Sequence, residues 1–325
     1  RYDALNRPVS VEAPDQSITR PRFNHAGLLQ GLSVQLRGAA APTSFVTAID
    51  HDAKGRRCSI TYGNGVRASS AYDPLTLRPT ASQTLRGTDR LQDLRYTHDA
   101  VGNLTQIEDR AQQTLYFKNQ VVAASAEYRY DALYRLRTAH GREHIGQASR
   151  PETRWDDAGR SCLPHPHDGQ AMRRYVQTYD YDPAGNLLQL THRAVGGDWT
   201  RHYHYQEASL IEAGQHNNRL SRVAVGGQPD EPYAHDTHGN MTRMPHLAAM
   251  HWDFADQLRR VDLGGGGMAY YVHDVAGQRL RKVVEKNNGN LIEERITLGG
   301  FDVFRRRNAA GVLLLEREMR TTPRA

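Results

Sequence analysis

Hydrophobic and polar residues alternate with a period of two over short runs, and turn-forming residues interrupt these runs repeatedly. In residues 179–190, Tyr179 and Tyr181 lie two positions apart, so both side chains fall on one face of a strand. Asp182 then suits the first position of a type I turn, and Gly185 suits its last. The alternation resumes after the turn. The stretch therefore predicts a β-hairpin whose turn ends on a residue with a left-handed backbone.

This unit recurs ten times, always with an aromatic residue or histidine directly before the aspartate. The aspartates and their closing residues are Asp3 and Asn6, Asp52 and Gly55, Asp73 and Thr76, Asp99 and Gly102, Asp131 and Tyr134, Asp156 and Gly159, Asp182 and Gly185, Asp236 and Gly239, Asp253 and Asp256, and Asp274 and Gly277. Most closing residues are glycine, asparagine or aspartate, which tolerate the left-handed backbone best. Residues 23–29 resemble a degenerate further copy. The recurrence indicates a repeat array.

The predicted fold class is all-β, with repetitive antiparallel hairpins in a long curved or spiralling sheet. Residues 1–325 form one array, in which the wider spacing over residues 137–174 predicts a loop excursion. Pro164 and Pro166 within that excursion interrupt strand hydrogen bonding. A short helix is expected near Glu207–Ala213, and residues 287–290 are expected to form a further hairpin turn.

Tyr134 occupies a position that glycine fills in six other copies. If the hairpin geometry is kept, Tyr134 takes a left-handed backbone, at a cost of roughly 1 kcal/mol or more. The alternative is a longer loop with an ordinary backbone at Tyr134. The flanking Tyr128, Tyr130 and Leu136 keep the phase of the repeat, which favours the strained turn.

Composition fits a sheet with much exposed surface. Only 38% of the residues are hydrophobic, and the 16 tyrosines outnumber the 6 phenylalanines and 3 tryptophans. Tyrosine suits half-buried strands because its ring is apolar and its hydroxyl is polar. The net charge of +6 means that nucleic-acid binding must be considered. The basic residues are scattered over turns, however, so nucleic acid is not an expected partner.

Neither the cysteines nor the hydropathy indicates a special compartment. Cys58 and Cys162 provide no disulfide framework. No apolar run is long enough for a membrane helix, and no signal peptide is visible. Arg1 lies inside a repeat and Ala325 follows shortly after a strand-like run, so the sequence is expected to be a fragment of a longer chain.

Candidate catalytic and metal-binding residues are few. Cys162, His165, His167 and Asp168 are weak candidates for a metal site, because zinc usually draws on two ligand pairs from separate elements. An ordered polar loop is the simpler reading. No phosphate-binding loop or metalloprotease motif is present, and the evenly repeated aspartates are typical of turns. No catalytic residue, cofactor or enzymatic activity is therefore expected.

The repeated Tyr-Asp-x-x-Gly-Asn-Leu pattern resembles the YD repeats of Rhs (rearrangement hotspot) proteins. Longer strings are similar to the C component of bacterial insecticidal toxin complexes. These strings are residues 128–136, 140–144, 217–220, 238–246 and 298–302. The resemblance covers nearly the whole chain.

This resemblance implies a hollow shell of spiralling β-ribbon that encloses a C-terminal toxin. In the family, an Rhs core segment before the toxin seals the shell and cleaves the chain. Here residues 313–325 carry neither a core segment nor a toxin, so no self-cleaving aspartate is transferred. The implied partners are another toxin-complex shell component, a pore-forming component and the encapsulated toxin. The implied location is secreted or at the bacterial cell surface, after synthesis in the cytoplasm.

Two functions remain open beside an enzyme, which no constellation supports. The first is a structural segment of an encapsulating shell. The second is a surface adhesin or carbohydrate-binding array, in which exposed tyrosine and tryptophan stack on sugars. The direction of the aromatic side chains discriminates between them. They lie between strands or face a lumen in a shell, and they cluster outward in a sugar-binding array.

Overall fold

The computed structural model describes residues 1–146 and 168–320, and the described part contains strands and turns without any helix. Two compact units are present. One comprises residues 1–144 and 168–176, and the other comprises residues 145–167 and 177–325. The boundary falls within strand β14 (Met172–Tyr181). Every pairing with a described register is antiparallel, so the expected all-β class of repeated antiparallel hairpins is confirmed.

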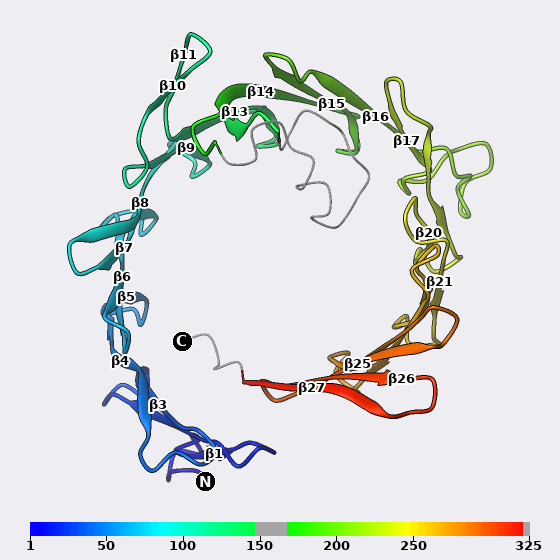
Figure 1. The fold of residues 1–325 in the computed structure, drawn as a ribbon. Coiled ribbons are helices and arrows are strands. Elements are labelled where there is room, and N and C mark those ends of the chain that lie inside the picture. Colours follow the sequence, from blue (N-terminus) through cyan, green and yellow to red (C-terminus); the bar gives the residue numbers. More distant parts are fainter. Residues whose placement is uncertain (147–167, 321–325) are drawn as a thin grey trace. The chain divides into compact units, whose positions relative to one another are not determined.

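The first unit is built from consecutive strands that pair in chain order. The strands are β1 (Val11–Glu12), β2 (Ile18–Phe23), β3 (Leu29–Gln35), β4 (Thr43–His51), β5 (Arg57–Tyr62), β6 (Val66–Tyr72), β7 (Pro79–Arg86), β8 (Asp89–His98), β9 (Leu104–Asp109), β12 (Ser125–Tyr130) and β13 (Leu136–His144). Strands β10 (Leu115–Phe117) and β11 (Gln120–Val122) form a separate hairpin between β9 and β12. Figure 1 shows β3 to β9 following one another along the chain.

The second unit continues the same pattern of antiparallel strands that pair in chain order. Strands β15 (Leu187–Ala194), β16 (Trp199–His204), β17 (Arg222–Val225) and β18 (Glu231–Pro232) pair in order. Strands β19 (Ala234–His235) and β20 (Met241–Arg243) form a small hairpin. A seven-stranded sheet then runs in order through β21 (Ala249–Trp252), β22 (Leu258–Asp262), β23 (Met268–His273), β24 (Arg279–Lys286), β25 (Leu291–Leu298), β26 (Phe301–Asn308) and β27 (Leu313–Arg320).

Buried hydrophobic side chains are small and spread along the strands. Val34, Ile49 and Ala139 are buried in the first unit. In the second unit, Val261 and Ala269 lie at the centre of a cluster on β21 to β24. Most contacts join strands that are neighbours in the sheet. Each hairpin is therefore held mainly by the hairpins on either side of it, which agrees with the low hydrophobic content.

Two expectations about irregular segments need correction. Residues 137–144 were expected to begin a loop, but they belong to β13, and β14 resumes at Met172. Residues 147–167 lie outside the described residues. The helix expected near Glu207–Ala213 is wrong, because bends and turns occupy this segment. Its backbone instead bonds across a loop, where the N–H of Ser209 donates to the carbonyl of Gln215 over 2.8 Å.

Candidate functional site

The repeated aspartate turns form the most regular set of polar side chains in the molecule. At Asp52, the backbone N–H donates to the carbonyl of Arg56, and the N–H of Gly55 donates back to the carbonyl of Asp52, both over 2.9 Å. The Asp52 Oδ1 atom accepts the N–H groups of Lys54 and Arg56, also at 2.9 Å. Gly55 has a φ of 78°, as a left-handed closing residue requires.

Turns of this kind stand at nine of the ten aspartates that the sequence singles out. The tenth, Asp156, lies outside the described residues together with Gly159. From Asp52 to Asp131, and again from Asp253 to Asp274, these aspartates occur at every second connection between antiparallel strands. Consequently the turns at Asp52, Asp99 and Asp131 all lie at the same end of the strands in the first unit. The turns at Asp253 and Asp274 likewise lie at the same end of the strands in the seven-stranded sheet.

Two copies close on a bulky residue in place of glycine, asparagine or aspartate. Tyr134 has a φ of 62°, so the strained alternative is the one observed, and its side chain is 59% exposed. At Asp73 the closing residue is Leu77, with a φ of 63°, where Thr76 was expected. The reason is that the Thr76 backbone N–H and hydroxyl both donate to Asp73 Oδ1, which lengthens this turn by one residue.

Asparagine replaces aspartate in two further turns of the same shape. The Asn24 Oδ1 atom accepts the N–H of Leu28, and the Asn308 Oδ1 atom accepts the N–H of Val312, both at 2.9 Å. The first of these is the degenerate copy that the sequence indicates at residues 23–29. The second was missed because its preceding residue is not aromatic. An amide oxygen can therefore take the place of the carboxylate oxygen toward the backbone.

In several copies the side chain of the residue that follows the closing position also bonds to the turn aspartate. Arg7, Arg56 and Arg135 each donate through Nε to the second carboxylate oxygen of their own turn aspartate, at 2.7 Å. In other copies an asparagine side chain does so, as Asn186 does to Asp182 at 2.7 Å. The hydrogen bond from the backbone N–H of Arg56, followed by that from its guanidinium, lowers the pKa of Asp52. These carboxylates are acceptors of structural hydrogen bonds.

Arg56 and Arg78, which each follow the closing residue of a turn, also reach the next turn along the sheet. Arg56 Nη1 donates to the carbonyl of Leu77 over 2.7 Å, and Arg78 Nη1 donates to the carbonyl of Asp99 over 2.9 Å. The turns at Asp52, Asp73 and Asp99 are thus joined by two arginine bridges. We call such side-chain links between successive turns the turn ladder. The sequence places basic residues directly after the closing position, but it gave no sign that they cross to the neighbouring turn.

Three of the aromatic residues that precede the aspartates contact the neighbouring hairpin. The Tyr130 hydroxyl donates to the carbonyl of Leu104 over 2.8 Å, and Trp252 Nε1 donates to the carbonyl of Met241 over 2.8 Å. The Arg56 guanidinium lies over the Tyr72 ring, 4.2 Å from its centroid. Each of these rings therefore covers the gap between hairpins while its polar atom reaches a backbone carbonyl.

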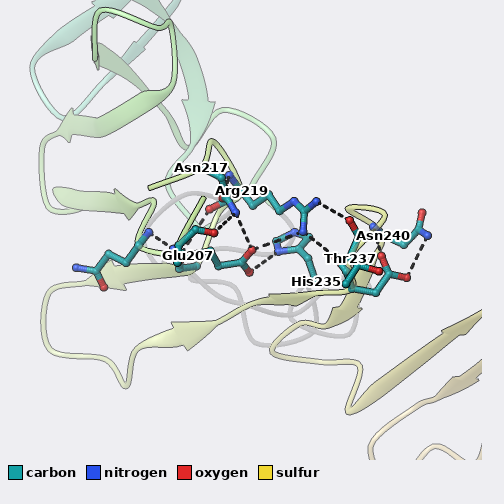
Figure 2. A network of polar contacts seen from close by, with 10 residues as sticks. Glu207, Asn217, Arg219, His235, Thr237 and Asn240 are labelled. Carbon is teal, nitrogen blue, oxygen red and sulfur yellow. Dashed lines mark hydrogen bonds and ion pairs between the residues drawn. The ribbon is translucent and has the colours of Figure 1, made fainter. Parts of the chain in front are cut away.

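In the second unit a polar network joins the loop between β16 and β17 to the turn at Asp236 (Figure 2). Asn217 and Arg219 lie on the loop that joins β16 to β17, and Glu207 lies at the start of the same loop. His235 Nδ1 lies 2.8 Å from Glu207 Oε1, and Arg219 Nη1 donates to the carbonyl of Asp236 over 2.6 Å. The network fastens the long loop to the turn at Asp236.

A second link continues from this turn to the following one. Asn240 Nδ2 donates to Asp256 Oδ1 over 2.7 Å, and His238 Nδ1 lies 2.8 Å from the same oxygen. The hydrogen bond and charge of Asp256 raise the pKa of His238. The turn ladder of the second unit therefore uses histidine and asparagine as well as arginine.

The weak metal-site candidates are not brought together by described geometry. Cys162, His165 and His167 lie outside the described residues. Asp168 is described, and its backbone carbonyl oxygen lies 3.0 Å from His144 Nε2. Within residues 1–146 and 168–320, no group of three or more potential metal ligands is found. The same part of the chain contains no helix long and apolar enough to cross a membrane.

Comparison with known proteins gives consistent similarities in sequence. No protein-family model matches the chain. The toxin subunit YenC1 of Yersinia entomophaga is 29% identical over 313 residues, which cover 91% of this chain and 30% of YenC1. The toxin subunit YenC2 of the same organism is 28% identical over 318 residues, covering 93% and 31%. The chain therefore spans about a third of the length of these relatives.

Solved structures resemble the chain over nearly its whole length. A structure of the Photorhabdus luminescens Tc holotoxin pore matches with a TM-score of 0.78 and 25% identity, covering 99% of this chain and 15% of that one. A crystal structure of TcdB2-TccC3 matches with a TM-score of 0.80 and 24% identity, covering 99% and 15%. The second likeness concerns the fold alone. Together, the similarities support a component of a toxin complex.

Proposed function

We propose that this chain, a homologue of the toxin subunits YenC1 and YenC2, is a structural segment of a toxin-complex C component whose repeat shell encapsulates a C-terminal effector. The chain forms part of the wall of the shell and has no catalytic centre of its own. Its partners are a second shell component, a pore-forming component and the effector of the full-length protein. The complete protein acts as a secreted or surface-displayed toxin complex.

The observation that carries this proposal is the direction of three repeat aromatics. Tyr130 and Trp252 reach backbone carbonyls on neighbouring hairpins, and Tyr72 lies beneath an arginine of the turn ladder. These side chains seal joints between hairpins, as a continuous wall requires. A sugar-binding array needs such rings on its surface, where they can stack on a ligand.

Exposed apolar residues at the turn tips also suit a segment of a larger wall. Leu75 and Leu133 are 91% and 67% exposed in the first unit, and Phe254 is 98% exposed in the second. Each lies in an aspartate turn, at the end of the two strands that the turn joins. Because the relatives are about three times as long as this chain, further hairpins of the full-length protein are available to cover these tips.

The test is protease protection of the C-terminal region in the full-length protein. We expect that region to resist a protease that digests it rapidly when it is expressed separately. A variant that combines Arg56→Lys and Arg219→Lys weakens the turn ladder and should expose the region at a lower denaturant concentration. The control variant combines Arg57→Lys with Arg259→Lys, at exposed positions outside the ladder.

Three results would contradict the proposal. The first is rapid digestion of the C-terminal region in the wild-type protein. The second is time-dependent self-fragmentation of this segment alone in a protease-free sample, seen by mass spectrometry, because that requires a catalytic centre here. The third is specific binding of saccharides that is lost when exposed Tyr116, on the β10–β11 hairpin, is replaced by alanine. That result would favour the carbohydrate-binding alternative.

A further inference from the structure

One face of the seven-stranded sheet carries a transverse row of two cations between two aromatic rings. The register places Tyr271 opposite Lys282, Lys282 opposite Arg295, and Arg295 opposite Phe304. Side chains directly opposite on antiparallel strands share a face, with Cβ atoms about 4.5–5.5 Å apart. The row therefore brings a lysine and an arginine close together across strands β24 and β25.

The row lines a hollow in the surface of the sheet. Arg279, Lys282, Arg295 and Phe304 border this hollow together with Glu293, Glu294 and Val284. Lys282 is half-buried, and its Nζ atom lies 5.7 Å from the centroid of the Tyr271 ring. Arg279 and Arg295 are exposed and lie close enough to act on the charge of Lys282. Three positive groups thus converge on one concave site.

The carboxylates beside this site are already paired with other cations. Glu293 lies 2.8 Å from Lys286 and 2.8 Å from Arg306. Glu294 lies 2.6 Å from Arg281, which is outside the row. Within the described part of the chain, Arg279, Lys282 and Arg295 form no ion pair with a carboxylate. The local charge of the hollow is therefore positive.

Such an arrangement is unfavourable when nothing occupies it. Like charges directly opposite each other on a sheet are destabilising. Burial, followed by the charges of Arg279 and Arg295, lowers the pKa of Lys282, so the lysine carries its charge at a cost. Elsewhere in the same sheet, arginine lies opposite glutamate, as Arg306 does to Glu293 and Arg305 to Glu316. The row breaks this rule of opposite-charge pairing.

We propose that Arg279, Lys282 and Arg295, flanked by Tyr271 and Phe304, bind an oxyanion, either a phosphate or a carboxylate group. The guanidinium of Arg295 offers a planar pair of N–H donors that matches two oxygens of one group. Lys282 contributes a compact charge from the opposite strand. The rings on both sides exclude water from the bound group and strengthen its electrostatic attraction. This site is independent of the encapsulating function.

The test is isothermal titration of the complete chain with inorganic phosphate and, separately, with citrate, at constant ionic strength in chloride. We expect saturable binding of at least one of them. The variant Lys282→Gln with Arg295→Gln should weaken that binding by tenfold or more. The control variant Lys54→Gln with Arg259→Gln also removes two positive charges, at exposed positions away from the row, and should bind as the wild type does.

The two ligands distinguish the source of the oxyanion. Binding of phosphate without citrate identifies a phosphate site, and binding of citrate without phosphate identifies a carboxylate site. Absence of saturable binding of either ligand would overturn the proposal. Equal binding by the wild type and the Lys282 and Arg295 variant would overturn it too. Circular dichroism of each variant checks that the sheet remains folded.

Discussion

Tyr134 shows what a single turn position demands of its residue. Its backbone is left-handed, although a residue with a Cβ atom pays roughly 1–2 kcal/mol for that conformation. The ring does not recover this energy by burial, since it is 59% exposed. The turn is instead held by Asp131, whose Oδ1 accepts the N–H groups of Leu133 and Arg135 at 2.8 Å and 2.9 Å.

Replacing Tyr134 by glycine should therefore stabilise the protein. Relief of the left-handed strain exceeds the loss of about 0.5–1 kcal/mol in chain entropy, so we expect a net gain of about 0.5–1 kcal/mol. Leu133→Gly is the matched control, because Leu133 is also exposed but has no positive φ, and it should destabilise. Urea unfolding of the three proteins measures both effects. A loss of stability in Tyr134→Gly would show that the exposed ring contributes more than its surroundings indicate.

The sequence predicts turn positions well because the left-handed residue and its aspartate are chemically specified. It failed at Asp73, where the choice between Thr76 and Leu77 depends on a side-chain hydrogen bond from Thr76. It also missed the reach of Arg56 to Leu77. That contact lies 21 residues away and depends on which hairpins become neighbours. Local patterns contain no direct information about such pairs.

At the scale of an element, strand β13 depends on a buried ion pair. Glu143 and Arg173 lie 2.7 Å apart, with side chains 10% and 3% exposed. Beside them, a Cβ atom added at Gly141 would come within 2.6 Å of the Tyr175 hydroxyl. The segment around residues 140–144 therefore packs tightly against β14, and its strand character could not be recognised from its charged and glycine-containing sequence.

Removing one partner of this ion pair should be costly. Glu143→Ala leaves the Arg173 guanidinium buried without that carboxylate, and we expect a loss of about 3 kcal/mol in the free energy of unfolding. The double variant Glu143→Met with Arg173→Leu should recover most of it, since neither charge is then buried. Chemical denaturation of both variants provides the measurement. If the double variant were no more stable than the single one, hydrophobic replacement would not substitute for the pair.

The turn ladder makes a second element-scale prediction. Arg56 donates to Asp52 and to the carbonyl of Leu77 while it stacks over Tyr72. Lysine cannot reproduce this forked geometry, so Arg56→Lys should cost about 1–2 kcal/mol although it keeps the charge. Arg57→Lys, at the next position and exposed, should change stability by less than about 0.5 kcal/mol. Thermal unfolding monitored by circular dichroism compares the two variants. Equal effects would show that the turn ladder does not contribute to stability.

At the scale of the whole molecule, the turn aspartates share one response to acid. The pKa values of Asp3, Asp52 and Asp131 are lowered, with the backbone N–H of the following arginine as the largest cause. A carboxyl group with a lowered folded-state pKa stabilises the fold above its ordinary value of 3.8, and this contribution is lost as pH falls through the lowered pKa. Repetition of the turn multiplies a small effect.

The melting temperature should therefore be nearly constant between about pH 7 and 5 and fall below about pH 4. Asp52→Asn should be less sensitive in the acid range, because an amide does not titrate and can keep the backbone contacts, as Asn24 does. Calorimetry across this range measures the difference between the two proteins. An identical acid response in both would show that other carboxyl groups dominate.

The array itself was predictable from the sequence, because period-two runs, aromatic leads and closing glycines all specify the same hairpin. The placement of the Lys282–Arg295 row was not. Lys282 and Arg295 face each other only because the turn at residues 287–290 sets the register between β24 and β25. A shift of one residue would send one of the two cations to the opposite face.

Because most contacts join neighbouring hairpins, the chain should respond to mechanical force in a particular way. A pull on one end loads the outermost hairpin before the rest, since few contacts carry the load to distant strands. Each hairpin within a unit then peels away at a force set by its contacts with the next hairpin. This force hardly depends on the number of hairpins that are still folded. A long array of this kind is therefore no harder to open from its end than a short one.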